Sequence, residues 1–222
     1  MLASRVAERF PGSSLSKLAE ELHAEARAAA GTARWLAAPR RSVRVLAALA
    51  VVLMLAAAGA TLFALNRRVA LFSSVADFLQ GLDALVNEVV LIGVAIFFLV
   101  NLETRIKRTR ALKAIHALRS MAHIIDMHQL TKDPERLTGP RADTLSSPER
   151  RMTSFELVRY LDYCSELLSL IGNQAALYVQ DFRDPVTLAA VDEVQDLTTG
   201  LSQKVWQKIM ILDRVSASRP GD

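Results

Sequence analysis

The sequence predicts an all-α membrane protein, in which a two-span transmembrane helical hairpin is followed by a cytoplasmic, coiled-coil-like bundle of three helices. Three observations support this fold class. Hydrophobic residues make up 51% of the 222 residues, but there are only nine glycines and seven prolines. Alternating apolar runs bounded by turn residues, which would indicate strands, are missing. Two apolar segments dominate residues 45–102, and beyond them apolar residues repeat at helical spacing.

The first span is predicted at residues 45–65, VLAALAVVLMLAAAGATLFAL, which are 21 residues without a charge. A helix needs about 20 residues to cross roughly 30 Å of hydrocarbon. The segment is not expected to be a secretory signal peptide, because 44 residues precede it and a charged n-region is far shorter.

The second span is predicted at residues 82–102. Its fully apolar part, residues 89–100, has only 12 residues and is too short to cross alone. The extension brings in polar residues near the two ends, where they cost less than at the midplane: Asp83, Asn87, Glu88 and Asn101. Residues 75–89 already carry apolar side chains at helical spacing, so we expect one amphipathic helix that becomes apolar as it enters the bilayer.

Basic residues predict the orientation of this hairpin. Arginines precede the first span, at positions 34, 40, 41 and 44, and a basic cluster follows the second: Arg105, Lys107, Arg108, Arg110 and Lys113. The positive-inside rule then places both termini in the cytoplasm, with the hairpin in the inner (plasma) membrane. The expected organisation is a cytoplasmic region 1–44, a hairpin 45–102 and a cytoplasmic bundle 103–222.

The N-terminal region is predicted to hold an amphipathic helix. After Pro11–Gly12, either Ser13 or Ser14 offers an N-cap, and the helix is expected to continue to about residue 30, where Gly31 interrupts it. Its apolar stripe is Leu15, Leu18, Leu22 and Ala26. Trp35 fits either the headgroup level of a bilayer or a packed core.

Residues 103–130 are predicted to continue the second span as a cytoplasmic helix, which ends before Pro134. Its stripe is Ala111, Ile115, Leu118, Ala122 and Ile125. Residues 131–152, rich in proline, serine and charge, are predicted to form a loop.

Two further helices have clear start signals. Thr153 and Glu156 form the pattern of a capping box, and Asp184 followed by Pro185 is typical of an N-cap and first helical position. The short link near residues 181–184 predicts an antiparallel pair. The apolar seam of the first is Leu157, Leu161, Cys164, Leu168, Ile171, Ala175 and Tyr178, and that of the second is Val194, Leu197, Leu201, Val205, Ile209 and Leu212.

A polar strip is predicted beside the 103–130 stripe, made of His116, Arg119, His123 and Asp126. The two histidines are seven residues apart, about 10 Å along a helix, which is too far for one metal ion without a partner helix. His123 with Asp126, and more weakly His116, are candidate metal ligands. A buried polar network between helices and a solvated face are the alternatives, and no metal or cofactor is expected.

Two other groups of polar residues have a functional interpretation. Asn87 and Glu88 would line a cation path if the chain forms a ring, or else contact water at the interface. The basic cluster at 105–113 would attract anionic lipid headgroups, although the topology signal alone also explains it. Nucleic-acid binding is not expected, because no aromatic residues are interleaved.

No phosphate-binding loop, serine elbow or paired-cysteine motif occurs, so the chain is not expected to be an enzyme. Cys164 lies in an apolar seam and is predicted to be a small, packed core residue rather than a nucleophile. Asp192, Glu193 and Asp196 are expected to form a solvated charged face, with a cation held by Glu193 and Asp196, three residues apart, as the alternative.

Three hypotheses of function remain. The first is a membrane-anchored scaffold or adaptor, acting through protein partners or as a homo-oligomer. The second is a subunit of a small oligomeric ion channel or transporter. The third is a metal- or pH-responsive regulator that depends on the histidines. They are ranked in this order.

Overall fold

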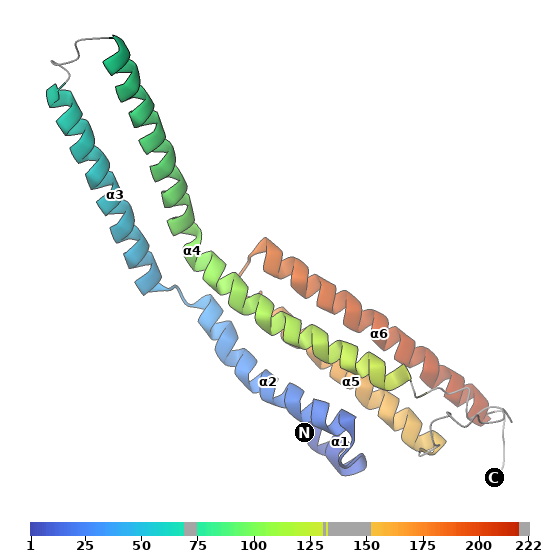
Figure 1. Cartoon of the computed structure of the whole chain (residues 1–222). Coiled ribbons are helices and arrows are strands. Elements are labelled where there is room, and N and C mark those ends of the chain that lie inside the picture. Colours follow the sequence, from blue (N-terminus) through green and yellow to red (C-terminus); the bar gives the residue numbers. More distant parts are fainter. Residues whose placement is uncertain (69–74, 131, 133–151, 218–222) are drawn as a thin grey trace. The chain divides into compact units, whose positions relative to one another are not determined.

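The computed structural model describes residues 1–68, 75–130, 132 and 152–217, and these residues are helical with short links (Figure 1). The part of the chain that the structure describes contains no strand, which confirms the all-α prediction. The six helices are α1 (Leu2–Arg9), α2 (Ser14–Ala37), α3 (Arg41–Arg68), α4 (Val75–Leu130), α5 (Ser154–Leu177) and α6 (Pro185–Ala217).

The chain divides into two compact units. We call Met1–Ala37 with Arg108–Asp222 the bundle unit, and Ala38–Lys107 the hairpin unit. Helix α4 contributes its first part to the hairpin unit and its last part to the bundle unit. The uninterrupted α4 agrees with the expectation that the second apolar segment and residues 103–130 belong to one helix.

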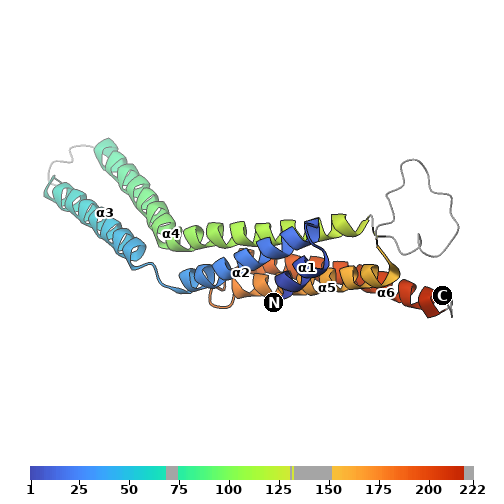
Figure 2. The ribbon, with the colours of Figure 1, turned by 90° about the horizontal axis from the view of Figure 1, so that it is seen from below.

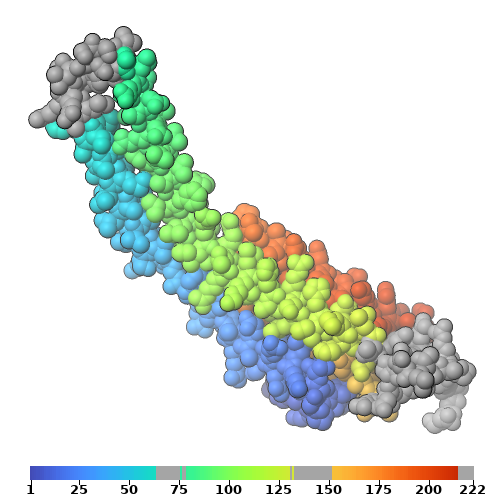
Figure 3. All heavy atoms as spheres, in the orientation of Figure 1, coloured from blue at the N-terminus to red at the C-terminus, as the bar shows by residue number. Residues whose placement is uncertain are grey.

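In the hairpin unit, α3 and the first part of α4 run antiparallel side by side (Figures 1 and 2). Both helices are long and apolar enough to cross a membrane. No other part of the described chain covers their apolar segments, and the two helices stand at the surface of the hairpin unit (Figure 3). Leu46, Leu53, Val89 and Phe97, for example, are each more than 60% exposed. A helix that is apolar on all sides and uncovered by protein is suited to lipid rather than to water.

The bundle unit buries the predicted seams of α5 and α6 against the last part of α4. All seven predicted seam residues, six in α5 and Tyr178 at its C-cap, are buried. In α6, Val194, Leu201, Val205, Ile209 and Leu212 are buried and Leu197 is half-buried. The stripe of α4, from Ala111 to Ile125, is also buried throughout. Helices α5 and α6 form an antiparallel pair (Figure 1), joined by residues 178–184, a link longer than the four residues expected.

The N-terminal helices also belong to this core, which the expected three-helix bundle did not include. Val6, Leu15, Leu18 and Leu22 are buried in the same apolar cluster as α4, α5 and α6. The ring of Phe10 meets the rings of Tyr160 and Tyr163 edge-on, with ring centroids 5.5 and 6.3 Å apart. Such aromatic contacts fix the turn between α1 and α2 against α5.

Two local expectations for α2 were wrong. The helix does not stop at Gly31 but continues to Ala37, because a single glycine costs a helix only about 1 kcal/mol. The buried stripe does not include Ala26, which is exposed; it continues instead through Ala29 and Leu36. The packing of the extra turns offsets the cost of the glycine.

The helix starts are as predicted. Ser13 is the N-cap of α2, since its hydroxyl accepts a hydrogen bond from the Ser16 amide at 3.1 Å. At α5, the Thr153 hydroxyl accepts from the Glu156 amide, and the Glu156 carboxylate accepts from the Thr153 amide at 2.8 Å, which completes the capping box. The predicted loop 131–152 lies, apart from residues 132 and 152, outside the described residues.

Candidate functional site

The carboxylate of Glu103 is the most densely paired group of the hairpin unit. It accepts hydrogen bonds from the backbone amide of Arg40 at 3.1 Å and from Nε of Arg44 at 2.5 Å. Lys107, one turn later on α4, brings its Nζ to 3.0 Å. Only 12% of the Glu103 side chain is exposed. We call these four residues the clasp, because they join the start of α3 to α4.

The clasp strongly favours the ionised form of Glu103. The hydrogen bond from Arg44 has the largest effect, burial opposes it, and the Arg40 amide and Lys107 add to it, so that the pKa of Glu103 falls to about 2. Charge-assisted hydrogen bonds of this kind are about twice as strong as neutral ones. A carboxylate so held joins the two helices at neutral pH.

A second polar contact joins the two helices farther along. The Thr61 hydroxyl of α3 lies 3.2 Å from both carboxyl oxygens of Glu88 on α4, and 2.7 Å from the carbonyl oxygen of Ala58. From Arg44 to Thr61 is about 25 Å along α3, and from Glu88 to Glu103 is about 22 Å along α4, at 1.5 Å per residue. The clasp and the Thr61–Glu88 contact therefore fix one antiparallel register.

The two polar residues predicted to line a cation path face different surroundings. Glu88 is half-buried and meets Thr61 of its own chain, whereas Asn87 is exposed. Neighbouring residues on a helix point about 100° apart, since one turn has 3.6 residues. The two side chains are therefore not equivalent, and Asn87 is the one that faces away from the hairpin.

The basic cluster at 105–113, predicted to meet lipid headgroups, has several partners within the protein. Lys107 is buried beside Glu103. The guanidinium of Arg110 lies 4.4 Å from the centroid of the Trp35 ring, and that of Arg105 lies 5.3 Å from the Phe98 ring. Lys113 is exposed. Trp35 is half-buried and stacks against Arg110 of its own chain. This contact favours the prediction that Trp35 packs within the protein over the prediction that it lies at the headgroup level.

Arg108, which the sequence analysis placed in the cluster predicted to meet lipid headgroups, pairs instead with an acid of the bundle unit. Its Nε lies 3.1 and 3.0 Å from the two carboxyl oxygens of Asp184, and a terminal nitrogen lies 2.6 Å from one of them. Asp184 also caps α6, since it accepts from the amide and the hydroxyl of Thr187 at 3.0 and 2.9 Å. Burial opposes ionisation of Asp184, but Arg108 and Thr187 outweigh it and keep the pKa below its usual value.

The predicted polar strip is only partly a network. Arg119 donates to the carboxylate of Glu193 on α6 at 2.8 Å, and both side chains are about half exposed. On α5, Asp162 pairs with Arg159 of its own helix and not with the strip. The partner of Arg119 is Glu193, which the sequence predicted to lie on a solvated acidic face.

The histidines of the strip lie on the surface. His116 and His123 are exposed, and Asp126 is half-buried. Among the described residues, no three histidine, cysteine, aspartate or glutamate side chains are placed to share a metal ion. At His128, near the end of α4, burial and the nearby Lys132 lower the pKa of the imidazole.

Cys164 is buried in the bundle core, as predicted for a seam position. Burial raises the pKa of its thiol to about 12. The thiolate is the reactive form of cysteine, so this residue is held in an unreactive state.

Comparisons of the chain with protein-family models, with curated proteins and with solved structures found no match.

Proposed function

We propose that this protein is a membrane-anchored helical scaffold, in which the hairpin unit inserts in the bilayer and the bundle unit binds protein partners. One observation carries the proposal. The described part of the hairpin unit leaves most of its large apolar side chains exposed, whereas the bundle unit buries its apolar side chains in a core. Water would penalise the first arrangement, and a bilayer removes the penalty.

We further propose that both termini face the cytoplasm of a bacterial-type inner membrane. Five arginines and lysines follow the second span and four arginines precede the first, whereas the connector between the spans carries only Arg67 and Arg68. The positive-inside rule places the clasp at the cytoplasmic surface.

This topology is tested by cysteine labelling from outside intact cells. The background is Cys164→Ala, which removes the buried thiol. Ser74→Cys, in the connector outside the described residues, should be labelled by an impermeant maleimide. Ser120→Cys and Ser169→Cys, both on exposed positions of the bundle unit, should be labelled only after the cells are opened. Labelling of Ser120→Cys in intact cells would overturn the proposed topology.

A partner is expected to bind to an exposed apolar surface on α6 and the last turns of α4. Trp206 and Met210, one turn apart on α6, are 60% and 50% exposed, and Met127 and Leu130 near the end of α4 are 66% and 72% exposed. Lys208 of α6 donates to the carbonyl oxygen of Gln129 at 2.7 Å, so these parts of α4 and α6 are neighbours. Exposed tryptophan and methionine are enriched at protein interfaces.

The scaffold proposal is tested with the full chain purified from its own membranes. A Trp206→Ser, Met210→Ser double variant should lose co-purifying proteins that the unchanged chain retains, identified by mass spectrometry. Val186→Ser with Leu188→Ser, which alters two other exposed apolar residues of α6, is the matched control. Partners retained by both variants would count against this surface, and a change in oligomeric mass with Trp206→Ser would identify a second copy as the partner.

A second candidate function, an ion-conducting oligomer, is favoured by Asn87. Its exposed amide lies in a segment whose other exposed residues are mostly apolar, and a polar group in hydrocarbon is costly unless it meets a partner. A second copy of the hairpin would supply that partner. This function requires conductance in reconstituted bilayers that changes in Glu88→Gln, and a well-folded oligomer without conductance would eliminate it.

A further inference from the structure

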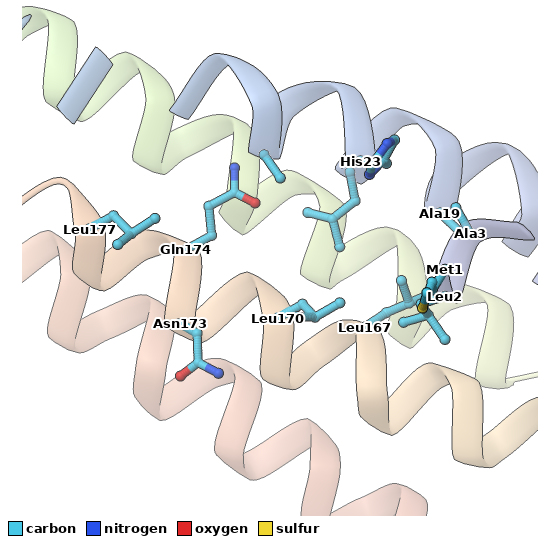
Figure 4. Close-up of a pocket in the computed structure, with 12 residues that line it drawn as sticks. Met1, Leu2, Ala3, Ala19, His23, Leu167, Leu170, Asn173, Gln174 and Leu177 are labelled. Atoms are coloured by element: carbon cyan, nitrogen blue, oxygen red, sulfur yellow. The ribbon is translucent and has the colours of Figure 1, made fainter. Parts of the chain in front are cut away.

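The bundle unit contains an apolar groove between its N-terminal helices and α5 (Figure 4). Its volume is about 530 Å³, within the range of small-molecule sites. Leucines and alanines of α1, α2 and α5 make most of the wall, and His23, Asn173 and Gln174 are its polar members. Both walls belong to the bundle unit, so the groove does not depend on how the hairpin unit is placed.

Gln174 is the unusual residue of this groove. Its side chain is directed from α5 toward α2 (Figure 4), and the residue is only 6% exposed. Among the described residues, neither its amide nitrogen nor the hydroxyl of Tyr178, the C-cap of α5, forms a hydrogen bond of ordinary geometry. A buried donor without a partner costs about 1–3 kcal/mol, and such groups are rare in native proteins. The amide carries two N–H groups. One lies close to the Tyr178 hydroxyl, and the other is left for an acceptor that is not part of the described chain.

The shape of the groove indicates what carries that acceptor. Its α5 wall runs from Leu167 to Leu177, which is about 15 Å at 1.5 Å per residue. A bilayer has roughly 30 Å of hydrocarbon in two leaflets, so one acyl chain spans about half of that length. An acyl chain of this length would cover the leucines of the groove, and its carbonyl or carboxyl oxygen would meet the Gln174 amide.

We propose that this groove binds a single long-chain fatty acyl group, with its carboxyl or carbonyl oxygen accepting a hydrogen bond from Gln174. The supply of such chains rests on the proposed membrane anchoring, because a protein held at a bilayer meets lipid at high local concentration. The groove itself does not rest on it. The same chemistry is offered by a free fatty acid and by the acyl chain of a phospholipid, and the experiment separates these two sources.

The test uses the full chain in nanodiscs with two photoactivatable probes that carry a diazirine in the acyl chain. One probe is a free C16 fatty acid, and the other is phosphatidylcholine with the same chain. Labelled peptides are mapped by mass spectrometry. We expect the groove peptides, residues 14–27 and 160–183, to be labelled as well as the hairpin peptides. Labelling of the groove by the fatty acid alone identifies a free acid, and labelling by both identifies an acyl chain in general.

Two variants and a control distinguish binding at a specific site from nonspecific contact with lipid. Leu170→Trp, at a 45% exposed wall position, should fill the groove and reduce groove labelling at least tenfold. Leu188→Trp, at a 48% exposed position of α6 outside the groove, is the matched control and should leave the labelling unchanged. Gln174→Leu should keep the apolar wall but weaken competition by unlabelled fatty acid about tenfold, as loss of one hydrogen bond predicts.

The outcomes separate the groove from the membrane anchor. Labelling confined to the hairpin peptides, or groove labelling that Leu170→Trp leaves intact, would overturn the proposed site while supporting insertion. Groove labelling by the free acid without labelling of residues 45–65 and 82–102 by the phospholipid would support the site and overturn the proposed insertion. Capture of a peptide from another protein in the groove in place of lipid would also overturn the acyl proposal.

Discussion

At the scale of single residues, Asp184 shows how one carboxylate holds several elements together. It caps α6 through Thr187 and pairs with Arg108 of α4, and it is only 3% exposed. A buried carboxylate is tolerated when its oxygens are occupied by charged and polar donors, as they are here. The link between α5 and α6 ends at this residue, so its pairing also places α6 against α4.

Substitution of Asp184 should separate its two roles. Asp184→Ala removes both, and we expect the bundle to lose about 1–2 kcal/mol from the cap alone, with a further loss from the pair with Arg108. Asp184→Asn keeps a good N-cap and loses only the charge, so it should be less harmful. Denaturant unfolding followed by circular dichroism measures both. Equal losses in the two variants would mean that capping contributes nothing.

His128 makes the bundle sensitive to mildly acidic pH. Burial and Lys132 lower its pKa in the folded protein, so the unfolded chain binds this proton more readily. Stability should therefore be full above about pH 7.5 and decrease as the pH falls through the ordinary histidine value of about 6.5. His128→Gln should flatten this decrease in thermal melts recorded between pH 5 and 8. His116→Gln removes an exposed imidazole and is the control; an equal flattening there would disprove the assignment.

At the scale of helices, Gly172 of α5 is in tight contact with Thr198 of α6. A Cβ added to this glycine would lie 3.0 Å from the Thr198 hydroxyl oxygen, whereas one added to Gly200 would meet nothing within 4 Å. Glycine in a helix interior costs about 1 kcal/mol relative to alanine. At Gly172 the cost is offset by the tight contact that it permits, and at Gly200 no described contact offsets it.

These two glycines give opposite predictions. Gly172→Val should destabilise the bundle by roughly 1–3 kcal/mol, because α5 and α6 must move apart. Gly200→Ala should stabilise it by up to about 1 kcal/mol through helix propensity. The midpoint of thermal unfolding of the two proteins, each compared with the unchanged chain, is the measurement. A stabilising Gly172→Val would show that the two helices do not meet there.

The two arms of the hairpin are held in register by the clasp, and the clasp depends on pH in a definite direction. The pKa of Glu103 is about 2 in the folded protein, compared with 4.5 for a glutamate outside the clasp. The stability that the clasp gives to the hairpin is therefore present above pH 4.5 and is lost as the pH falls toward 2. Infrared difference spectra between the unchanged chain and Glu103→Gln should show a carboxylate that protonates only near pH 2. Protonation of that group near pH 4.5 would mean that the clasp is not formed.

At the scale of the whole molecule, local signals were readable from the sequence and distant pairings were not. The capping box at Thr153 and the N-cap at Asp184 rest on residues three apart, and both were predicted. Arg108 and Asp184 are 76 positions apart, so no pattern in the chain indicated their pairing. The partner of Arg119 was missed for the same reason. In the sequence Glu193 has the features of a solvated acid, and only the packing of α4 against α6 brings it to Arg119. The burial of the Gln174 amide in the groove had no sequence signal at all.

The proposed anchoring leads to one substitution with opposite consequences in lipid and in water. Leu91, in the middle of the second apolar segment, is 62% exposed. If that surface faces hydrocarbon, Leu91→Arg should oppose insertion of the second span by about 2.5–3.5 kcal/mol. The first span would still anchor the chain, but the bundle unit would then lie outside, and Ser120→Cys would be labelled in intact cells. If the surface faces water, the same change at an exposed position should alter stability by no more than about 0.5 kcal/mol and leave the labelling unchanged. Met127→Arg, at an exposed position of the bundle unit, is the control and should also leave the labelling unchanged. A Leu91→Arg protein in which Ser120→Cys is still labelled only after the cells are opened would count against a lipid-facing α4, and with it the proposed hairpin.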